Sequence, residues 1–358
     1  MSRYWSEATQ LLSPYVPGEQ PKKGTDVLKL NTNEHPYGPS PRVLEAIAQA
    51  TNNSLRLYPD PDSQTLRKIL AEYVDVVGVT ENEIFVGNGS DEVLAHIFCA
   101  LLKHEKPILF PDITYSFYPV YCGLYGVDYQ TIPLDAEFGL KVSDYNLPNG
   151  GIIFANPNAP TGKALPLADI TCLLRNNPDS VVVIDEAYVD FGAESATKLV
   201  AKYPQLLVVQ TLSKSRALAG MRIGFAIGDR GLIEGLNRVK NSFNSYPLDR
   251  LAQAAAQAAI EDNAYFEAMR HCVMDARQWL TEALAERDFE TLPSAANFIL
   301  TAHRAVPGKQ LFNALRSRNI LVRYFNAPRL EKHVRITIGS QAQCETLVRA
   351  LDDILQDA

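Results

Sequence analysis

The chain has 358 residues and a formal net charge of −7, with 46% hydrophobic and 21% charged residues, the composition of a globular protein large enough for two domains. The acidic balance argues against nucleic acid or anionic membrane as a partner, and no segment resembles a membrane span or a signal peptide, so we expect a cytoplasmic protein. The five cysteines include no Cys-x-x-Cys pair, and we expect neither a metal site nor a redox pair.

Residues 1–40 form an irregular arm rich in proline and glycine, with one strand-like piece at 27–30. Such arms are mobile or wrap another surface, and we expect this one to pack with a smaller C-terminal domain. The stretch 31–34 could be a turn or the edge of a site. A helix is predicted over 41–50, because Ser and Pro precede it and suit helix starts.

The segment 57–61 is predicted to be a rigid, exposed turn, so Tyr58 is either a surface aromatic residue or a hydroxyl offered to a neighbour. A helix is predicted over 65–73. Further on, the stretch 83–94 predicts a strand, a glycine turn and a helix capped by Ser90 or Asp91.

Glu92 occupies the third glycine position of the dinucleotide-binding fingerprint, which argues against a nicotinamide enzyme. The free backbone N–H groups at such a helix start favour phosphate. A plain strand–turn–helix connection explains the pattern equally well.

Strand and helix patterns alternate through the middle of the chain, which is typical of an α/β domain with a mostly parallel sheet between layers of helices. We expect this large domain to span 41–250 and a smaller α+β domain to span 251–358. The strands of the large domain are predicted at 107–110, 127–132, 151–154, 181–184, 206–209 and 224–228, with a helix from about 116. In the small domain, helices are predicted at 251–261, 265–287, 308–317 and 341–355, and strands at 298–300, 321–323 and 334–338.

Lys214, Asp185 and Asn156 each stand just beyond a predicted strand. Because the carboxyl ends of parallel strands meet at one rim of a sheet, we expect these side chains to converge. A buried carboxylate needs a cationic partner, and a protonated pyridine nitrogen would suit Asp185. A helix cap at Asp185 and a tight turn at Asn156 are the alternatives.

The neighbours of Lys214 are those that a phosphate-bearing aldehyde cofactor requires. A lysine condenses with an aldehyde, Ser213 and Arg222 can hold a phosphate, and Tyr188 could reach the phenolic oxygen of a pyridine ring. Lys–Ser pairs are also common in solvated loops, so this segment alone leaves both interpretations open.

Together these residues resemble the fold-type I pyridoxal-phosphate aminotransferases, and within them the class that includes histidinol-phosphate aminotransferase. The resemblance extends from about residue 10 to the end of the chain. It rests on Asn156-Pro-x-x-Pro-Thr-Gly, Asp185-Glu-Ala-Tyr188, Ser213-Lys214 and Gly220-x-Arg222-x-Gly224, joined by Asn31-x-Asn-Glu34-x-Pro36, Tyr58-Pro59, Gly89-Ser90-Asp91-Glu92 and Arg335-Ile-Thr-Ile-Gly339.

The resemblance implies pyridoxal 5′-phosphate as the cofactor. Lys214 would carry it as a Schiff base and move the reacting proton, while Asp185 would keep the ring nitrogen protonated. Asn156 and Tyr188 would bind the phenolic oxygen of the ring, and Tyr115 would stack on its face. The phosphate would be held by Ser90, Asp91, Ser213 and Arg222, with Tyr58 reaching in from the partner subunit of a homodimer.

The resemblance also implies that Arg323 and Arg335 bind the anionic end of the substrate, with Tyr15 of the arm near a substrate phosphate and Asn33 among the substrate contacts. A surface ion pair is the alternative for either arginine alone. Ala159 stands where many relatives have Asn, and we expect this difference to weaken no cofactor contact.

The expected reaction is the transamination of L-histidinol phosphate with 2-oxoglutarate, giving imidazole-acetol phosphate and glutamate, a step of histidine biosynthesis. An aromatic amino-acid aminotransferase is one alternative, because a pocket for imidazole often accepts phenyl. A phosphothreonine-type decarboxylase is another, because it shares the cofactor motifs. A ligand-sensing module is disfavoured by the intact Lys214 and the lack of a basic DNA-binding segment.

Overall fold

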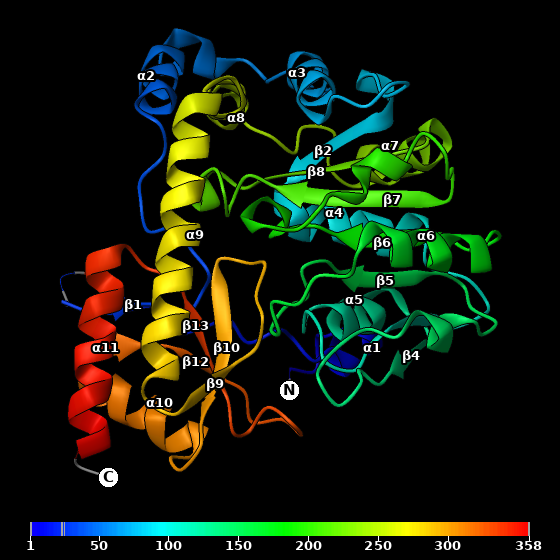
Figure 1. Ribbon diagram of the computed structural model, residues 1–358. Coiled ribbons are helices and arrows are strands. Elements are labelled where there is room, and N and C mark those ends of the chain that lie inside the picture. Colours follow the sequence, from blue (N-terminus) through cyan, green and yellow to red (C-terminus); the bar gives the residue numbers. More distant parts are fainter. Residues whose placement is uncertain (1, 23, 25, 357–358) are drawn as a thin grey trace.

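A seven-stranded sheet forms the centre of the larger of two units (Figure 1). The computed structural model describes residues 2–22, 24 and 26–356. The strand order is β2-β8-β7-β6-β5-β3-β4, and β8 is antiparallel to both of its neighbours while the other pairs are parallel. The strands are β2 (Ile84–Asn88), β3 (Ile108–Pro111), β4 (Tyr129–Ile132), β5 (Ile152–Ala155), β6 (Val182–Asp185), β7 (Leu206–Thr211) and β8 (Ile223–Gly228).

Each face of this sheet carries its own core, because successive strand residues point to opposite faces. Ile184 of β6 packs in a core completed by α2, α3, α6 and α8, whereas the adjacent Val183 packs in a core with α4, α5 and α7. The mostly parallel, helix-covered sheet expected from the sequence is confirmed. The helices are α2 (Pro41–Ala50), α3 (Gln64–Val74), α4 (Gly89–Ala100), α5 (Tyr118–Tyr125), α6 (Leu167–Asn176), α7 (Arg230–Phe243) and α8 (Arg250–Glu261).

The smaller unit contains a four-stranded antiparallel sheet of order β12-β13-β10-β9, with α9, α10 and α11 packed against it. The strand β1 of the N-terminal arm pairs in parallel with β11, so the arm enters this unit. The bounds are β1 (Leu28–Lys29), α9 (Asn263–Ala285), β9 (Phe289–Thr291), β10 (Phe298–His303), α10 (Gly308–Ser317), β11 (Ile320–Leu321), β12 (Arg323–Tyr324), β13 (Val334–Thr337) and α11 (Gln341–Gln356).

Helix α8 packs with the core of the larger unit. Its buried residues, among them Ala255 and Ala256, lie in the same cluster as Ile184, whereas α9 joins the core of the smaller unit from Val273 onward. We therefore propose that the domain boundary lies between α8 and α9 rather than at residue 251.

Some local expectations differ from the structure. Helix α4 begins at Gly89 and its N-cap is Asn88, which makes no side-chain capping bond, so the expected cap by Ser90 or Asp91 is wrong. The strand expected at 321–323 is divided at Val322 into β11 and β12. Three elements were not anticipated: α1 (Glu7–Leu11), α6 and β9.

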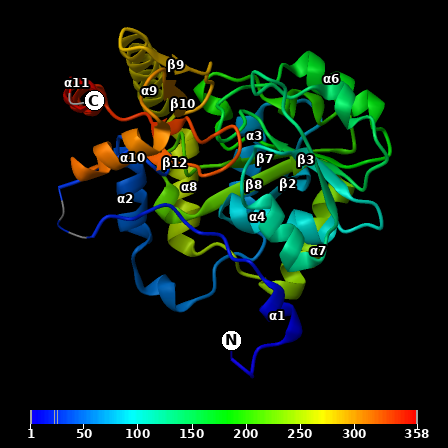
Figure 2. The same ribbon diagram turned by 90° about the horizontal axis from the view of Figure 1, so that it is seen from below.

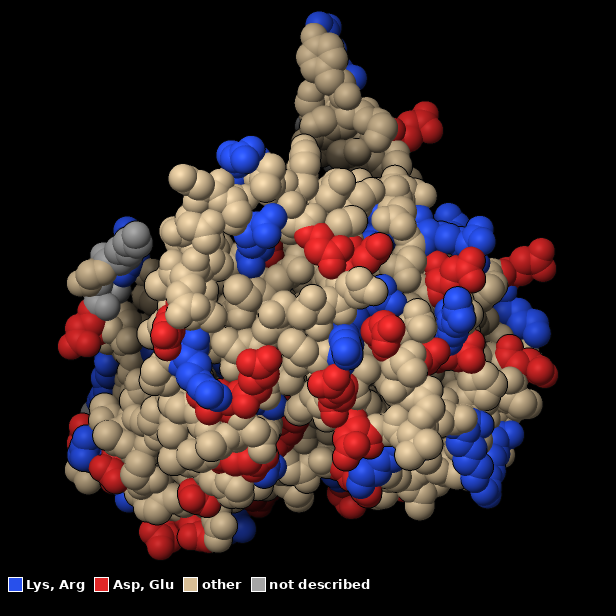
Figure 3. Space-filling view, turned by 90° about the horizontal axis from the view of Figure 1, so that it is seen from above, with Lys and Arg blue, Asp and Glu red and all other residues tan. Residues whose placement is uncertain are grey.

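The N-terminal helix α1 projects from the body of the molecule (Figure 2). On the face drawn in Figure 3, acidic and basic side chains are interspersed rather than gathered into a patch of one sign. None of the helices within the described residues has the length and apolar character needed to cross a membrane.

Candidate active site

A cavity of ≈ 530 Å³ lies where the carboxyl ends of β5, β6 and β7 face the smaller unit. The structure brings together at this cavity every site residue expected from the sequence except Asn156 and Tyr58. The expected site residues that line it are Tyr15, Asn33, Ser90, Asp91, Tyr115, Asp185, Tyr188, Ser213, Lys214, Arg222, Arg323 and Arg335.

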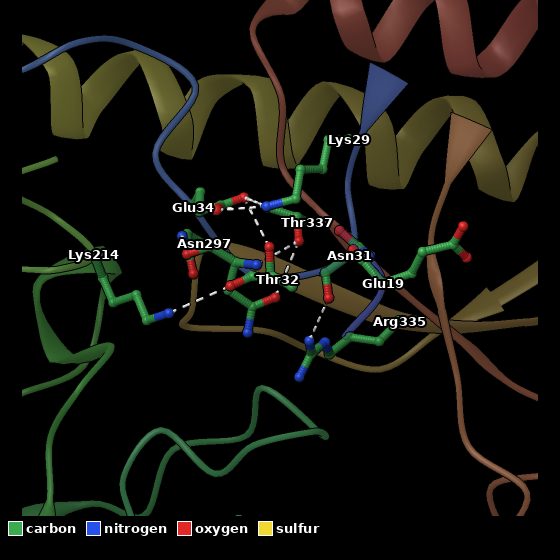
Figure 4. Close-up of polar contacts among 10 residues, drawn as sticks. Glu19, Lys29, Asn31, Thr32, Glu34, Lys214, Asn297, Arg335 and Thr337 are labelled. Atoms are coloured by element: carbon green, nitrogen blue, oxygen red, sulfur yellow. Dashed lines mark hydrogen bonds and ion pairs between the residues drawn. The ribbon is translucent and has the colours of Figure 1, made fainter. Parts of the chain in front are cut away.

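Lys214 enters the cavity from the turn after β7. Its Nζ donates a hydrogen bond to the backbone carbonyl of Thr32 at 3.4 Å (Figure 4). The same Nζ lies 5.6 Å from the centroid of the Tyr188 ring. On the side away from the cavity, the buried Ser215 holds the turn by donating to the Asp190 carboxylate. The amine is therefore presented at the centre of the site.

Asp185 ends β6 at the floor of the cavity and is 4% exposed. Its Oδ2 accepts from the Tyr118 hydroxyl at 3.2 Å, and its Oδ1 accepts from the N–H of Ala187 at 3.2 Å. These bonds do not offset the loss of water, because burial raises the pKa of Asp185 to about 6. A cationic group of a ligand would therefore be favoured beside it.

Arg222 and the N-terminus of α4 form one end of the cavity, and two glycines allow β8, α4 and Arg222 to pack closely there. A Cβ atom on Gly224 would lie 2.3 Å from the backbone nitrogen of Ser90. A Cβ atom on Gly89, which has a φ of +83°, would lie 2.5 Å from Nη2 of Arg222. Backbone N–H groups at a helix start and a guanidinium are suited to a phosphate.

Asp91 orients the other residues at this end. Its Oδ1 accepts from the Tyr115 hydroxyl at 2.8 Å and its Oδ2 pairs with Arg222 at 3.0 Å. A carboxylate has no proton to donate to a phosphate, so the predicted contact of Asp91 with a phosphate would be made by its backbone N–H.

Asn156 turns away from the cavity. Its Oδ1 accepts from the N–H of Leu165 at 2.7 Å, and its Nδ2 donates to the carbonyl of Leu165 at 3.2 Å. The turn instead presents Ala159 to the cavity. The bond to Leu165 uses one of the two hydrogens on Nδ2, so the expected bond from Asn156 to a ring oxygen stays a prediction, while position 159 faces the site with an apolar side chain.

Tyr188 lies on the wall of the cavity beside Lys214. Its ring packs edge-on against Phe298 at 5.0 Å between centroids. Its hydroxyl receives a hydrogen bond from Nδ2 of Asn33 at 3.0 Å. Asn33 is 1% exposed and is thus a fixed part of the wall.

Two arginines of the smaller unit form the opposite end of the cavity. Arg335 donates from Nη2 to the carbonyl of Asn31 at 2.9 Å, and its guanidinium lies over the rings of Phe298 and Phe325 at 5.2 and 5.6 Å. Arg323 also lies over Phe325, at 5.6 Å. Burial lowers the pKa of Arg335, which an anion beside it would counteract.

The arm closes this end of the cavity through Tyr15, whose ring lies 4.8 Å from that of Phe117. Tyr58, in contrast, lies on the surface of the same chain. Its side chain is 78% exposed and its ring stacks on Tyr246 at 4.6 Å between centroids.

Two residues of the site were not anticipated. Thr32 contributes its backbone carbonyl to Lys214, and a backbone group leaves no signal in a side-chain pattern. Glu186 is buried behind Asp185 and accepts hydrogen bonds from Ser195, Gln210 and the N–H of Ala196. Burial raises its pKa to about 7. The signal that could have found it is a second acidic residue directly after a buried strand.

The chain matches a known family over most of its length. Residues 25–351 match the family model described as aminotransferase class I and II. The chain belongs to this family. A histidinol-phosphate aminotransferase 1 from Hydrogenovibrio crunogenus is 59% identical over 356 residues, which cover 99% of each chain.

Solved structures agree with this class I and II aminotransferase fold. A histidinol-phosphate aminotransferase from Sinorhizobium meliloti, in complex with pyridoxal-5′-phosphate, has a TM-score of 0.87 at 24% identity and covers 100% of this chain and 99% of its own. An L-threonine-O-3-phosphate decarboxylase from Porphyromonas gingivalis has a TM-score of 0.77 at 24% identity, covering 92% of this chain and 100% of its own. The aminotransferase fold is therefore shared with a decarboxylase, and the fold alone does not define the reaction.

Proposed function

We propose that this chain is a pyridoxal-phosphate-dependent aminotransferase that converts L-histidinol phosphate and 2-oxoglutarate into imidazole-acetol phosphate and glutamate, in histidine biosynthesis. The observation that carries the proposal is the placement of Lys214 between a phosphate-suited pocket and a pair of arginines. The 59% identity to a histidinol-phosphate aminotransferase over 99% of both chains supports this choice of substrate.

The residues of the cavity fit pyridoxal phosphate. The end of the cavity lined by Ser90, Ser213 and Arg222 would hold its phosphate, since it offers two hydroxyl groups and a guanidinium. Asp185 offers the ring nitrogen a buried carboxylate, whose pKa is raised by burial and would be lowered again by a cation beside it. When bound through Lys214, the cofactor supplies an electron sink for the bonds at the substrate's α-carbon.

Side chains of the cavity would transfer the proton and hold the cofactor ring. Nζ of Lys214 would take the proton from the substrate's α-carbon and deliver it to C4′ of the cofactor, which requires an amine free to move within the cavity. Asp185 keeps a proton on the nitrogen that it faces. Tyr188 would donate its hydroxyl proton to the ring's phenolic oxygen, and Tyr115, held by its bond to Asp91, would stack on the ring.

The arginine end of the cavity accepts both substrates. Arg323 and Arg335 would bind the phosphate of histidinol phosphate in one half-reaction and a carboxylate of 2-oxoglutarate or glutamate in the other. The Tyr15 hydroxyl is available to the same anion. The aromatic side chains beside the arginines suit an imidazole ring, and they suit a phenyl ring equally.

We further propose that the enzyme is a homodimer in which Tyr58 completes the site of the partner subunit. Tyr58 lies outside the cavity of its own chain and is mostly exposed. Leu55 and Leu57, which precede it closely in the sequence, and Tyr246, which stacks on it, are also exposed, and exposed apolar side chains that lie together indicate a protein interface. We also propose that the enzyme works in the cytoplasm, where its unpaired cysteines would remain reduced.

A half-reaction titration tests the substrate assignment. Purified protein loaded with pyridoxal phosphate is mixed, without an oxo acid, with L-histidinol phosphate, glutamate, phenylalanine or phosphothreonine, and the visible band is followed. Rapid loss of the band at the lowest concentration of histidinol phosphate supports the proposal. Equal or better conversion by phenylalanine would make the enzyme an aromatic aminotransferase, and carbon dioxide release from phosphothreonine would make it a decarboxylase.

A further inference from the structure

Asn33 donates to the hydroxyl of Tyr188, and the direction of this hydrogen bond is set by the groups around it. The hydroxyl of Thr337 accepts from the backbone N–H of Asn33 at 2.9 Å and donates to its Oδ1 at 3.1 Å. With Oδ1 facing Thr337, Nδ2 faces Tyr188 at 3.0 Å. An amide NH₂ only donates, so the proton of the Tyr188 hydroxyl is not used in this bond.

The backbone around Asn33 is suited to hold this amide in place. Its φ is +57°, a left-handed conformation that Asn adopts more readily than most residues. Its carbonyl accepts from Nδ2 of Asn297 at 3.0 Å. Figure 4 shows this segment between Lys214 on one side and Arg335 on the other.

The Asn156–Gly162 turn contributes Ala159 and Pro160 to the lining of the cavity, and neither has a polar side chain that could bind the Tyr188 hydroxyl. The charged groups around Tyr188 are cations. Lys214 lies 5.6 Å from its ring centroid, and Arg335 lies over the same Phe298 ring that packs against Tyr188. Neither cation can accept the hydroxyl proton, so the cavity is where that proton can point.

We propose that Asn33 is a positioning residue that, by donating to the Tyr188 hydroxyl, directs the proton of Tyr188 into the cavity and strengthens it as a donor to the phenolic oxygen of bound pyridoxal phosphate. The inference rests on the proposed function, and it gives Asn33 a role other than the substrate contact expected from the sequence. Because Thr337 and Asn297 belong to the smaller unit, Asn33 also ties Tyr188 to the unit that carries Arg335.

The test is a pH titration of the visible band of the protein loaded with pyridoxal phosphate. A hydrogen bond to the phenolic oxygen draws negative charge from it, so the nitrogen joined to Lys214 loses its proton at lower pH. Asn33→Gly removes the amide without straining the left-handed backbone. We expect it to raise the midpoint by about 0.5–1 pH unit, the size of one hydrogen bond.

Two further variants make the test specific to Tyr188. Asn33→Asp replaces the donor with an acceptor of the same shape, and we expect a rise at least as large as that of Asn33→Gly. In a Tyr188→Phe background, Asn33→Gly should leave the midpoint where Tyr188→Phe alone sets it. A further rise in this double variant would overturn the inference, because Asn33 would then act without Tyr188.

The matched control is Asn31→Ala, since Asn31 also lines the cavity but its amide donates to the carbonyl of Glu19 at 2.8 Å. Its midpoint should equal that of the wild type, and a shift as large as that of Asn33→Gly would contradict a specific role. A wild-type protein that acquires no visible band contradicts the proposed function as well. A titrating band with the same midpoint in wild type and Asn33→Gly contradicts this inference alone.

Discussion

Arg323 and Arg335 lie directly opposite each other on the antiparallel strands β12 and β13. Like charges in such a cross-strand pair destabilise a sheet. Both arginines line the cavity, where the guanidinium of Arg323 lies over the Phe325 ring and that of Arg335 lies over the Phe298 ring. An anion between the two arginines removes the repulsion, so anion binding and stability are linked at this site.

Arg335→Gln should therefore weaken substrate binding and stabilise the free protein. We expect KM to rise at least about tenfold for both histidinol phosphate and glutamate, because a charge-assisted hydrogen bond contributes about 1.5–3 kcal/mol. The melting temperature without added anion should stay the same or rise. Arg349→Gln, on the exposed side of α11, is the control and should change neither quantity. A rise in KM for only one substrate would exclude a shared anion site.

Gly224→Ala should disrupt the phosphate end of the cavity. The added Cβ would lie within 2.5 Å of the backbone of Gly89 and Ser90, and backbone atoms cannot rotate away. We expect pyridoxal phosphate to bind at least about tenfold more weakly and the protein to lose about 1–3 kcal/mol of stability. Gly220→Ala, in the same motif, is the control, because a Cβ there meets no atom within 4 Å. Cofactor titration monitored by absorbance distinguishes the two variants.

The raised pKa of Asp185 predicts that the stability of the cofactor-free protein depends on pH. Its pKa rises from an ordinary 3.8 to about 6 in the folded state because of burial. Between pH 3.8 and about 6, Asp185 therefore holds a proton in the folded state that it has lost in the unfolded state. The stability that the protonated Asp185 contributes is fully present below pH 3.8 and is lost as the pH rises through about 6. The loss is at most about 3 kcal/mol.

Asp185→Asn replaces the ionisable carboxyl group with an amide that does not titrate. Without cofactor, the variant should be more stable than the wild type at pH 8, and the difference should shrink toward pH 4, as measured by urea unfolding at several pH values. With pyridoxal phosphate the order should reverse at pH 8, because the ring nitrogen supplies the cation that the carboxylate lacks. A stability difference that does not depend on pH would contradict this account of Asp185.

Tyr58 permits a test of the proposed dimer by complementation. Lys214→Ala and Tyr58→Ala should each be nearly inactive alone. If Tyr58 serves the partner's site, a hybrid of the two contains one site with both defects and one intact site. After mixed refolding, we expect activity of about a quarter of the wild type, since half of the dimers are hybrids. Mixtures that remain inactive, or an active monomer in gel filtration, would contradict the shared site.

Much of the fold followed from short apolar runs. Strands such as β6 and β7 are buried along their whole length, so unbroken apolar runs with intervening helices predicted the mostly parallel sheet. The helix α6 was not predicted, and the first helix of the expected small domain, α8, packs with the larger unit. Which core a helix joins depends on tertiary contacts, which a periodic pattern does not contain.

The site was predictable wherever the chain placed a side chain directly at the end of a strand. Asp185 and Lys214 are such residues, and both line the cavity. In the turn after β5, however, the sequence suggested Asn156, and the structure presents Ala159. Turn residues point in several directions within a few positions, and only the bonds of Asn156 to Leu165 reveal which way it faces.

The pairing of β1 with β11 has a consequence for how the chain reaches its native state. Asn33 and Thr337, which bond to each other, are 304 positions apart. During synthesis, the arm therefore leaves the ribosome long before the strands that will hold it. The larger sheet can assemble on the nascent chain, but the cavity wall around Lys214 is complete only after β13, which carries Arg335 and Thr337, has been made. A chain truncated before β13 would therefore fold in part without acquiring a complete site.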